Sequence, residues 1–375
     1  MIPAMSAQPL HSDPAVAAGI DQLLSLLPEG ASPDLVGQLL AQVMGLSGKG
    51  MHRGELKLLS ASLADFARSF EAFSGHRQSR KISIFGSARS PEESEIYQHC
   101  LRLSEAAVAR GWMVITGAGP GIMEAGNRGA TRERSFGVSI DLPFEASAND
   151  YIDGDSKHVH FKYFFSRKLA FVKESDAIVL YPGGFGTMDE GFESLTLLQT
   201  GKCDPLPVIL VDIPGGDYWP AWERYVRENL LGRGLISPYD RNLYRYTTSP
   251  EQALDEIEQF YRCYHSLRYV DGDYTILRLR QAPTPELLEH LNTRYADLLV
   301  EGSRFEHLTE PHPEEEGEPE VVRALPRIGF RYIQRRLGRL RRLIDDLNLA
   351  MSNGQCPAAT APPRGSGALH LPAGE

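Results

Sequence analysis

Three glycine-rich turns each follow a short apolar run, and their residues suit the binding of an anion. Gly86-Ser87 follows Ile82–Phe85, Gly117-Ala118-Gly119-Pro120-Gly121 follows Met113–Thr116, and Pro182-Gly183-Gly184-Phe185-Gly186-Thr187 follows Ala177–Tyr181. Glycine lets the backbone approach a ligand closely, and the free N–H groups at a helix start attract negative charge. Tight strand-to-helix turns also need glycine for folding alone. Three such turns together favour a phosphate-binding site.

These turns match neither of two common nucleotide-binding signatures. No Gly-Lys-Ser/Thr follows at the spacing of a P-loop, and the second turn places its glycines at every second residue instead of as GxGxxG. We therefore expect a small phosphorylated ligand and not a dinucleotide. The turn residues expected to bind its phosphate and sugar are Gly86, Ser87, Gly119, Gly121, Gly183, Gly184, Phe185, Gly186 and Thr187.

Charged side chains near the third turn can act on the rest of such a ligand. Glu190 and Glu193 are three residues apart, which places them on one face of a helix that begins near Thr187. Acids suit ribose hydroxyls or a developing positive charge. Each acid alone is also explained by the preference of acids for a first helical turn.

Two further segments add charged candidates. Arg167 and Lys168 lie on the preceding helix and can offset the acids or reach substrate oxygens. Glu124 lies just inside the helix after the second turn. We expect Glu124, Lys168 and Glu193 to contact the substrate, although a basic pair is more often a solvated surface. No HExxH or comparable metal-ligand spacing occurs, and we expect no metal and no cofactor.

The elements that must position these residues alternate between short β-rich runs and helix-length segments. This alternation predicts an α/β domain over residues 81–265, with a doubly wound, Rossmann-like parallel sheet and helices on both faces. The carboxyl ends of parallel strands meet at one edge, where ligands bind. The expected strands are Ile82–Phe85, Met113–Thr116, Phe136–Ile140, Ala177–Tyr181 and Pro207–Val211.

The flanks of this domain read differently. Residues 1–80 predict a helical N-terminal extension, and 266–309 an α/β extension with a strand at Tyr274–Leu279. Residues 310–325 are rich in glutamate and predict a solvated linker. Residues 326–351 predict an arginine-rich amphipathic helix, with a coiled-coil-like apolar stripe from Ile333 to Leu347 that packs in an oligomer. Residues 352–375 predict a disordered tail.

Composition excludes several classes of protein. The 375 residues carry 39 basic and 49 acidic side chains, a net charge of −10, so a uniformly basic nucleic-acid binder is not expected. No apolar run approaches the ~20 residues of a membrane span, and the start lacks the pattern of a signal peptide. Four scattered cysteines argue against a disulfide framework. We expect a cytoplasmic protein with no membrane or nucleic-acid partner.

The motif residues resemble those of a known family. Thr116 to Glu124, Ser166-Arg167-Lys168 and Pro182 to Glu190 together are similar to the LOG family, whose members are often labelled lysine decarboxylases. The PGGxGTxxE pattern is met in full, and the resemblance covers residues 80–265. Long bacterial members with added terminal helices, including nucleotide nucleosidases, look more similar than short plant-type members.

The resemblance implies hydrolysis of the N-glycosidic bond of a nucleoside 5′-monophosphate such as AMP, which gives free base and ribose 5-phosphate. It implies that Arg167 and Glu190 are catalytic and that the glycine loop binds phosphate. Short cytokinin-activating members carry Met-His where this chain has Phe164-Phe165, so the resemblance does not fix the base.

Two other functional classes stay open at this point. The same fold holds nucleotides or a molybdenum cofactor in carrier proteins without turnover, although the presence of both Arg167 and Glu190 favours an enzyme. A scaffold whose arginine-rich C-terminal helix binds acidic partners, lipids or RNA is the third class. We expect a homo-oligomer, a dimer or higher, with a small-molecule nucleotide substrate.

Overall fold

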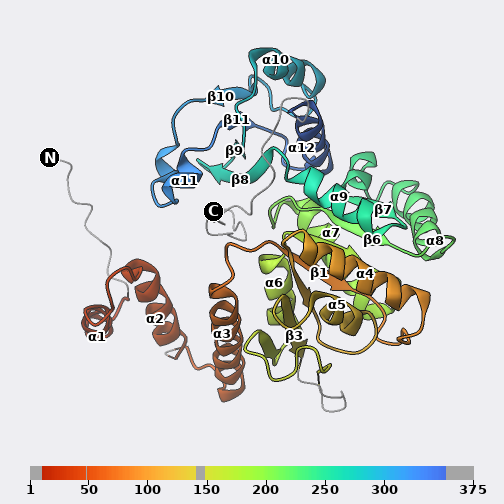
Figure 1. Ribbon diagram of the computed structural model, residues 1–375. Coiled ribbons are helices and arrows are strands. Elements are labelled where there is room, and N and C mark those ends of the chain that lie inside the picture. The colour runs from red at the N-terminus through yellow and green to blue at the C-terminus, as the bar shows by residue number, and fades with distance from the viewer. Residues whose placement is uncertain (1–10, 48, 141–147, 352–375) are drawn as a thin grey trace. The chain divides into compact units, whose positions relative to one another are not determined.

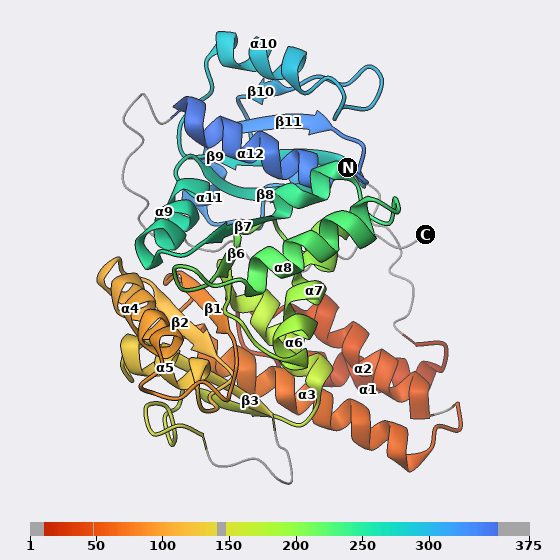
Figure 2. The same ribbon diagram turned by 90° about the vertical axis from the view of Figure 1, so that its right-hand side faces the viewer.

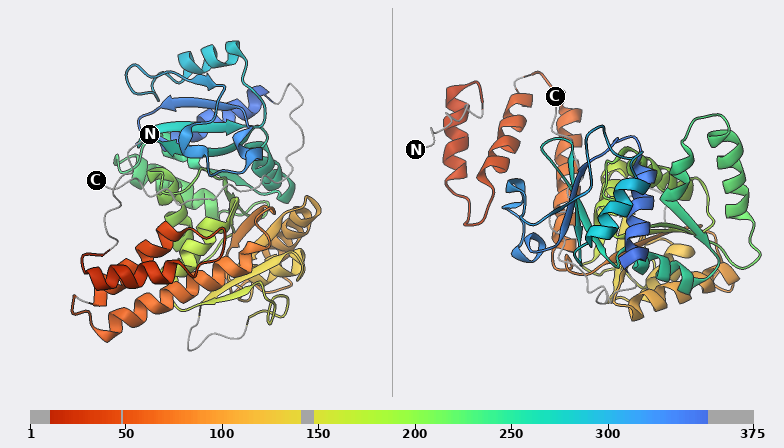
Figure 3. Two further views of the ribbon diagram at one scale, coloured as in Figure 1. Left: turned by 90° about the vertical axis from the view of Figure 1, so that its left-hand side faces the viewer. Right: turned by 90° about the horizontal axis from the view of Figure 1, so that it is seen from above.

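The chain forms two compact units. The computed structural model describes residues 11–47, 49–140 and 148–351, and Figures 1 to 3 show it from several sides. The units are Met1–Ala64 and Asp65–Glu375, so the division falls within helix α3. The first unit consists of α1 (Pro14–Leu24), α2 (Pro33–Ser47) and the beginning of α3 (Arg53–Ser74).

The second unit is built on a seven-stranded sheet in which every neighbouring pair is parallel. The strand order is β4-β3-β2-β1-β5-β6-β7, as expected of a doubly wound fold. β2, β1 and β5, which precede the three glycine turns, are adjacent at its centre. The strands are β1 (Lys81–Phe85), β2 (Met113–Thr116), β3 (Ser135–Ile140), β4 (His158–Phe161), β5 (Ala177–Leu180), β6 (Val208–Val211) and β7 (Tyr244–Thr247).

Helices cover both faces of this sheet, which is why its central strands are apolar without interruption. Along β5, Ala177 and Val179 join the core beneath α4, α5 and α9, whereas Ile178 and Leu180 join the core beneath α6, α7 and α8. Figure 2 shows α4 and α5 on one side of β1 and β2 and α6 and α7 on the other. These helices are α4 (Glu95–Ala109), α5 (Ile122–Ala130), α6 (Phe164–Glu174), α7 (Phe185–Thr200), α8 (Tyr218–Tyr225) with the π-helix η1 (Val226–Leu231), and α9 (Pro250–Phe260).

A second, antiparallel sheet follows, next to the β6–β7 side of the first (Figures 1 and 2). Its order is β10-β11-β9-β8, and the expected strand Tyr274–Leu279 is its β9. Its side chains join the core beneath α4 and α9. The remaining elements are η2 (Pro238–Leu243), β8 (Tyr264–Val270), α10 (Pro285–Arg294), β10 (Glu306–Leu308), η3 (Pro313–Glu315), α11 (Glu320–Arg323), β11 (Arg327–Arg331) and α12 (Leu337–Met351).

The expectation of one helix over residues 326–351 is wrong. Residues Arg327–Arg331 form strand β11, which pairs with β9 and β10, and α12 begins only at Leu337. The apolar stripe of α12 is buried within this chain, with Leu340, Ile344 and Leu347 at 1% exposure or less. The stripe therefore needs no second copy to cover it. The expected tail 352–375 lies outside the described residues.

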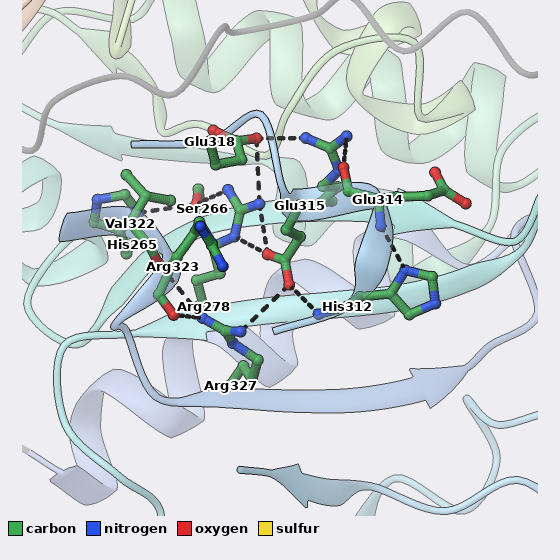
Figure 4. A network of polar contacts seen from close by, with 11 residues as sticks. His265, Ser266, Arg278, His312, Glu314, Glu315, Glu318, Val322, Arg323 and Arg327 are labelled. Atoms are coloured by element: carbon green, nitrogen blue, oxygen red, sulfur yellow. Dashed lines mark hydrogen bonds and ion pairs between the residues drawn. The ribbon is translucent and has the colours of Figure 1, made fainter. Parts of the chain in front are cut away.

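The expectation of a solvated linker over residues 310–325 is also wrong in its central part. The side chain of Glu315 is 0% exposed and forms ion pairs with Arg278 at 2.7 Å and with Arg327 at 3.4 Å. Figure 4 shows the Glu315 carboxylate between these two guanidinium groups, with Glu318 on the far side of Arg278. A buried arginine requires a partner. The acidic residues of the segment 310–325 supply this partner, although the composition of the segment alone predicts a solvated linker.

This network predicts a large difference between two neighbouring glutamates. Glu315→Ala should lower the free energy of unfolding by about 3–5 kcal/mol, because Arg278 and Arg327 lose a buried counter-charge. Glu316 is exposed, and Glu316→Ala should change that free energy by less than about 0.5 kcal/mol. Urea unfolding of both variants measures the difference. Equal effects would contradict the packed segment.

Candidate active site

The three glycine turns lie together at the carboxyl ends of β2, β1 and β5. The backbone N–H of Ser87 donates to the Pro182 carbonyl at 3.1 Å, and the N–H of Ile122 donates to the Ser87 carbonyl at 3.0 Å. The first turn thus bridges the other two. This arrangement agrees with the edge that the strand pattern predicts for a ligand site.

Three of the glycines have a packing reason that does not depend on a ligand. A Cβ added to Gly86 would lie 2.6 Å from the Ile122 side chain. Gly121 has φ +68°, and its Cβ would meet the Ser87 carbonyl oxygen at 2.4 Å. At Gly183 the clash is with Thr187 Oγ1, at 2.1 Å. Folding alone explains these three positions, whereas a Cβ at Gly119 would meet only the flexible end of the Met123 side chain.

Gly184 and Gly186 differ from Gly86, Gly121 and Gly183. A Cβ added at either position meets nothing within 4 Å, and neither residue has a positive φ. They lie at the start of the long helix α7, whose N-cap residue Gly184 makes no side-chain capping bond. The side chain of Phe185 between them is 97% exposed. The turn therefore presents backbone and open space where α7 begins.

Two residues that sequence reasoning missed hold the turns in place. The Tyr218 hydroxyl donates to the Gly183 carbonyl at 2.5 Å, and the Asn149 side-chain amide donates to the Gly119 carbonyl at 3.0 Å. Each lies about 30 residues from its partner along the chain. No local motif marks either residue, because the sequence records no contact between distant segments.

The charged candidates from α6 and α7 face one another. Arg167 Nη2 lies 3.8 Å from Glu190 Oε1, and Lys168 Nζ lies 3.8 Å from Glu190 Oε2. Lys168 also pairs with Asp189 at 2.9 Å and with Glu193. The structure thus unites Arg167, Lys168, Glu190 and Glu193, as the spacing predicts. The Glu124 carboxylate accepts a hydrogen bond from the Tyr97 hydroxyl of α4 at 3.1 Å.

Glu190 is the buried member of this cluster, with its side chain 7% exposed. Burial disfavours the charged carboxylate and raises the pKa of Glu190 to about 7. The positive charges of Lys168 and Arg167 lower this pKa but offset burial only in part, and the negative charges of Glu193 and Asp189 raise it further. Both cations lie beyond hydrogen-bond distance, which limits their compensation. A carboxyl of this kind exchanges its proton near neutral pH.

Comparisons with known proteins agree with these motifs. Residues 119–257 match the family model described as "possible lysine decarboxylase". The cytokinin riboside 5′-monophosphate phosphoribohydrolase of Mycobacterium tuberculosis is 30% identical over 173 residues, 43% of this chain and 88% of that protein. The chain belongs to the LOG family. A probable cytokinin riboside 5′-monophosphate phosphoribohydrolase of Oryza sativa subsp. japonica, LOGL2, is 26% identical over 48% of this chain and 73% of its own length.

A solved structure is also similar to this LOG-family chain. The alignment with the molybdenum cofactor binding protein of Rippkaea orientalis covers 48% of this chain and 95% of that protein, with 19% identity and a TM-score of 0.35. At that identity and TM-score the likeness bears on neither the ligand nor the function.

The description "lysine decarboxylase" raises the question of pyridoxal phosphate, which binds through a Schiff-base lysine. Lys168 is the lysine of this charged cluster. Burial lowers its pKa, but the carboxylates of Glu193, Asp189 and Glu190 outweigh burial and raise the pKa above its ordinary value. A Schiff-base nucleophile needs the opposite shift. The cluster does not fit that cofactor. Among the described residues no group of three His, Cys, Asp or Glu can hold a metal ion.

The unusual pKa of Glu190 predicts a pH-dependent stability. The folded protein keeps the Glu190 proton up to about pH 7, whereas the unfolded chain releases it near pH 4.5. The stability that this proton contributes is therefore complete below pH 4.5 and is lost as pH rises towards 7. The glutamine side chain of Glu190→Gln does not titrate. The difference in unfolding free energy between wild type and variant therefore isolates Glu190, because all other titrating groups are the same in both. The wild type should lose roughly 1–3 kcal/mol relative to this variant across that range, measured by urea unfolding. A difference that does not change with pH would contradict the shift.

Proposed function

We propose that this protein hydrolyses the N-glycosidic bond of nucleoside 5′-monophosphates and releases free base and ribose 5-phosphate. The observation that carries the proposal is the buried Glu190 carboxyl, which faces Arg167 and lies one helical turn beyond the open glycine turn. Membership of the LOG family and the names of its curated relatives support the same class of reaction.

The start of α7 is the proposed phosphate site. Gly184 and Gly186 have neither a packing nor a backbone requirement for glycine, which supports a close approach of the ligand to the main chain. The first N–H groups of α7 and the Thr187 hydroxyl supply donors, and the helix dipole favours the dianion. Binding energy at the phosphate then positions the sugar for reaction.

Glu190 is the proposed catalytic carboxylate. When the bond between C1′ and the base nitrogen breaks, its electron pair leaves with the base and positive charge develops on the ribose, as in glycoside hydrolysis. The Glu190 carboxylate stabilises this charge or accepts the proton of the water whose oxygen bonds to C1′. Arg167 neutralises phosphate or assists the departing base. Glu193 and Lys168 complete the charged wall beside the sugar.

The proposal predicts a strong preference for phosphorylated substrates. AMP should be cleaved with a kcat/KM at least about 100-fold higher than that of adenosine, because the phosphate anchor is absent from the nucleoside. Chromatography of the products from AMP, adenosine and a panel of other nucleoside monophosphates measures this ratio and identifies the preferred base. Equal rates for AMP and adenosine would contradict the proposed role of the phosphate. A wild type that binds AMP but cleaves none of the panel would favour a carrier protein.

Two glycine variants serve as matched controls for the phosphate position. A Cβ at Gly184 meets nothing within 4 Å, so the side chain of Gly184→Val should extend into the space in front of the turn. AMP affinity measured by calorimetry should then be lost while the protein stays folded. Gly75→Val also meets open space but lies after helix α3, and it should bind AMP like the wild type. Unchanged affinity in Gly184→Val would place the phosphate elsewhere.

A further inference from the structure

Helix α6 carries Arg167 and Lys168, yet its own residues leave its start without a side-chain cap. The helix begins at Phe164, and the N-cap residue Tyr163 makes no side-chain hydrogen bond to the first turn. The position of this first turn decides where the two cations point.

Asp65 of helix α3, about 100 residues earlier in the chain, binds the two residues that precede α6 and a hydroxyl of its first turn. The Asp65 carboxylate accepts hydrogen bonds from the backbone N–H of Lys162 at 3.1 Å and of Tyr163 at 3.4 Å. It also accepts one from the Ser166 hydroxyl at 2.7 Å. The Asp65 side chain is 0% exposed, and Arg68 pairs with it at 2.7 Å. One buried carboxylate thus holds both the entry to α6 and the residue next to Arg167.

A purely structural contact is the simpler explanation of such an aspartate. Here, however, the turn that Asp65 holds and the charged cluster are continuous. Ser166 is held by Asp65, and the next two residues are the ones that face Glu190 from α6. A change in the first turn therefore moves both cations with respect to Glu190.

We propose that Asp65 is a positioning residue for the hydrolysis: it fixes the first turn of α6 so that Arg167 and Lys168 face the Glu190 carboxylate. This inference rests on the proposed function. It gives the part of α3 that belongs to the second unit a role at the site through α6.

Loss of the Asp65 contact changes the electrostatics at Glu190, which the loss of a purely structural contact does not. The charged groups that face Glu190 are Lys168 and Arg167 from α6, and Glu193 and Asp189 from its own helix α7. If the α6 turn loosens, the cations move away and the acids stay. The pKa of Glu190 then rises further, so a reaction that needs its carboxylate requires a higher pH.

The test compares variants at two positions on α3. Asp65→Ala should lower kcat for AMP about 10-fold or more, since the cations that face Glu190 are displaced. The acid limb of its pH–rate profile should move to higher pH by about 0.5–1. Asp65→Asn keeps one oxygen that can accept hydrogen bonds from the same partners, so its kcat and acid limb should fall between those of wild type and Asp65→Ala.

Phe73→Leu is the matched control. Phe73 is buried two turns further along α3 and stacks on Phe136 with ring centroids 4.1 Å apart. Its replacement should lower the melting temperature but leave kcat and the acid limb at wild-type values. Hydrogen exchange gives a readout without substrate: the amides of residues 162–168 should exchange faster in Asp65→Ala and not in Phe73→Leu.

The outcomes separate this inference from the proposed function. A wild type that cleaves no nucleotide overturns the proposed function and this inference with it. An active wild type whose kcat and acid limb are unchanged in Asp65→Ala overturns only the positioning role. The same holds if Phe73→Leu reproduces both changes, or if the amides of residues 162–168 exchange at the wild-type rate in Asp65→Ala. If Asp65→Ala does not fold, the comparison of Asp65→Asn with Phe73→Leu decides in the same way.

Discussion

The close contact of three glycine turns at one sheet edge is the constraint on which the site depends. A side chain at Gly183 would collide with Thr187 Oγ1, and one at Gly121 would collide with the Ser87 carbonyl. The absence of these side chains lets backbone hydrogen bonds join the turns directly. Helix α7 therefore starts at a fixed point above β5, and Glu190 follows one turn later. Any ligand held by the N–H groups of α7 would lie at a fixed distance from that carboxyl.

The second constraint is electrostatic and acts between α6 and α7. Two cations face three carboxylates, Asp189, Glu190 and Glu193, and the most buried of the three is the least well compensated. Lys168 pairs closely with Asp189 and Glu193, which leaves Glu190 at 3.8 Å from either cation. This unequal sharing keeps the pKa of Glu190 near neutrality. Carboxyl groups so tuned are typical of sites that move protons or stabilise developing charge.

Local sequence pattern predicts the central part of this molecule well. The parallel strands are recognisable because both of their faces are buried, so apolar residues run without interruption, and the turns between strand and helix are marked by glycine. The site then follows from topology, since the carboxyl ends of adjacent parallel strands meet at one edge. The roles of Arg167 and Glu190 in catalysis stay predictions, drawn from a family resemblance and from chemistry.

The parts that the sequence did not predict all depend on distant pairing. Residues 327–331 satisfy a helical spacing, but pairing with β9 and β10 makes them a strand. The glutamates after residue 310 read as solvated, because the buried Arg278 that binds Glu315 lies 37 residues away. Asp65 has no motif at all, and its role at α6 is visible only in three dimensions. Each of these contacts overrides a local preference through tertiary structure.

Glu190→Gln removes only the charge of the proposed catalytic carboxyl. Single-turnover release of ribose 5-phosphate from AMP is measured for wild type and Glu190→Gln, alongside equilibrium binding of AMP to each. Turnover should fall by on the order of 10²–10³, or ~2.7–4 kcal/mol of transition-state stabilisation, while AMP binding persists or tightens because a negative charge near the phosphate is lost. Normal turnover by Glu190→Gln, beside an active wild type, would contradict the account.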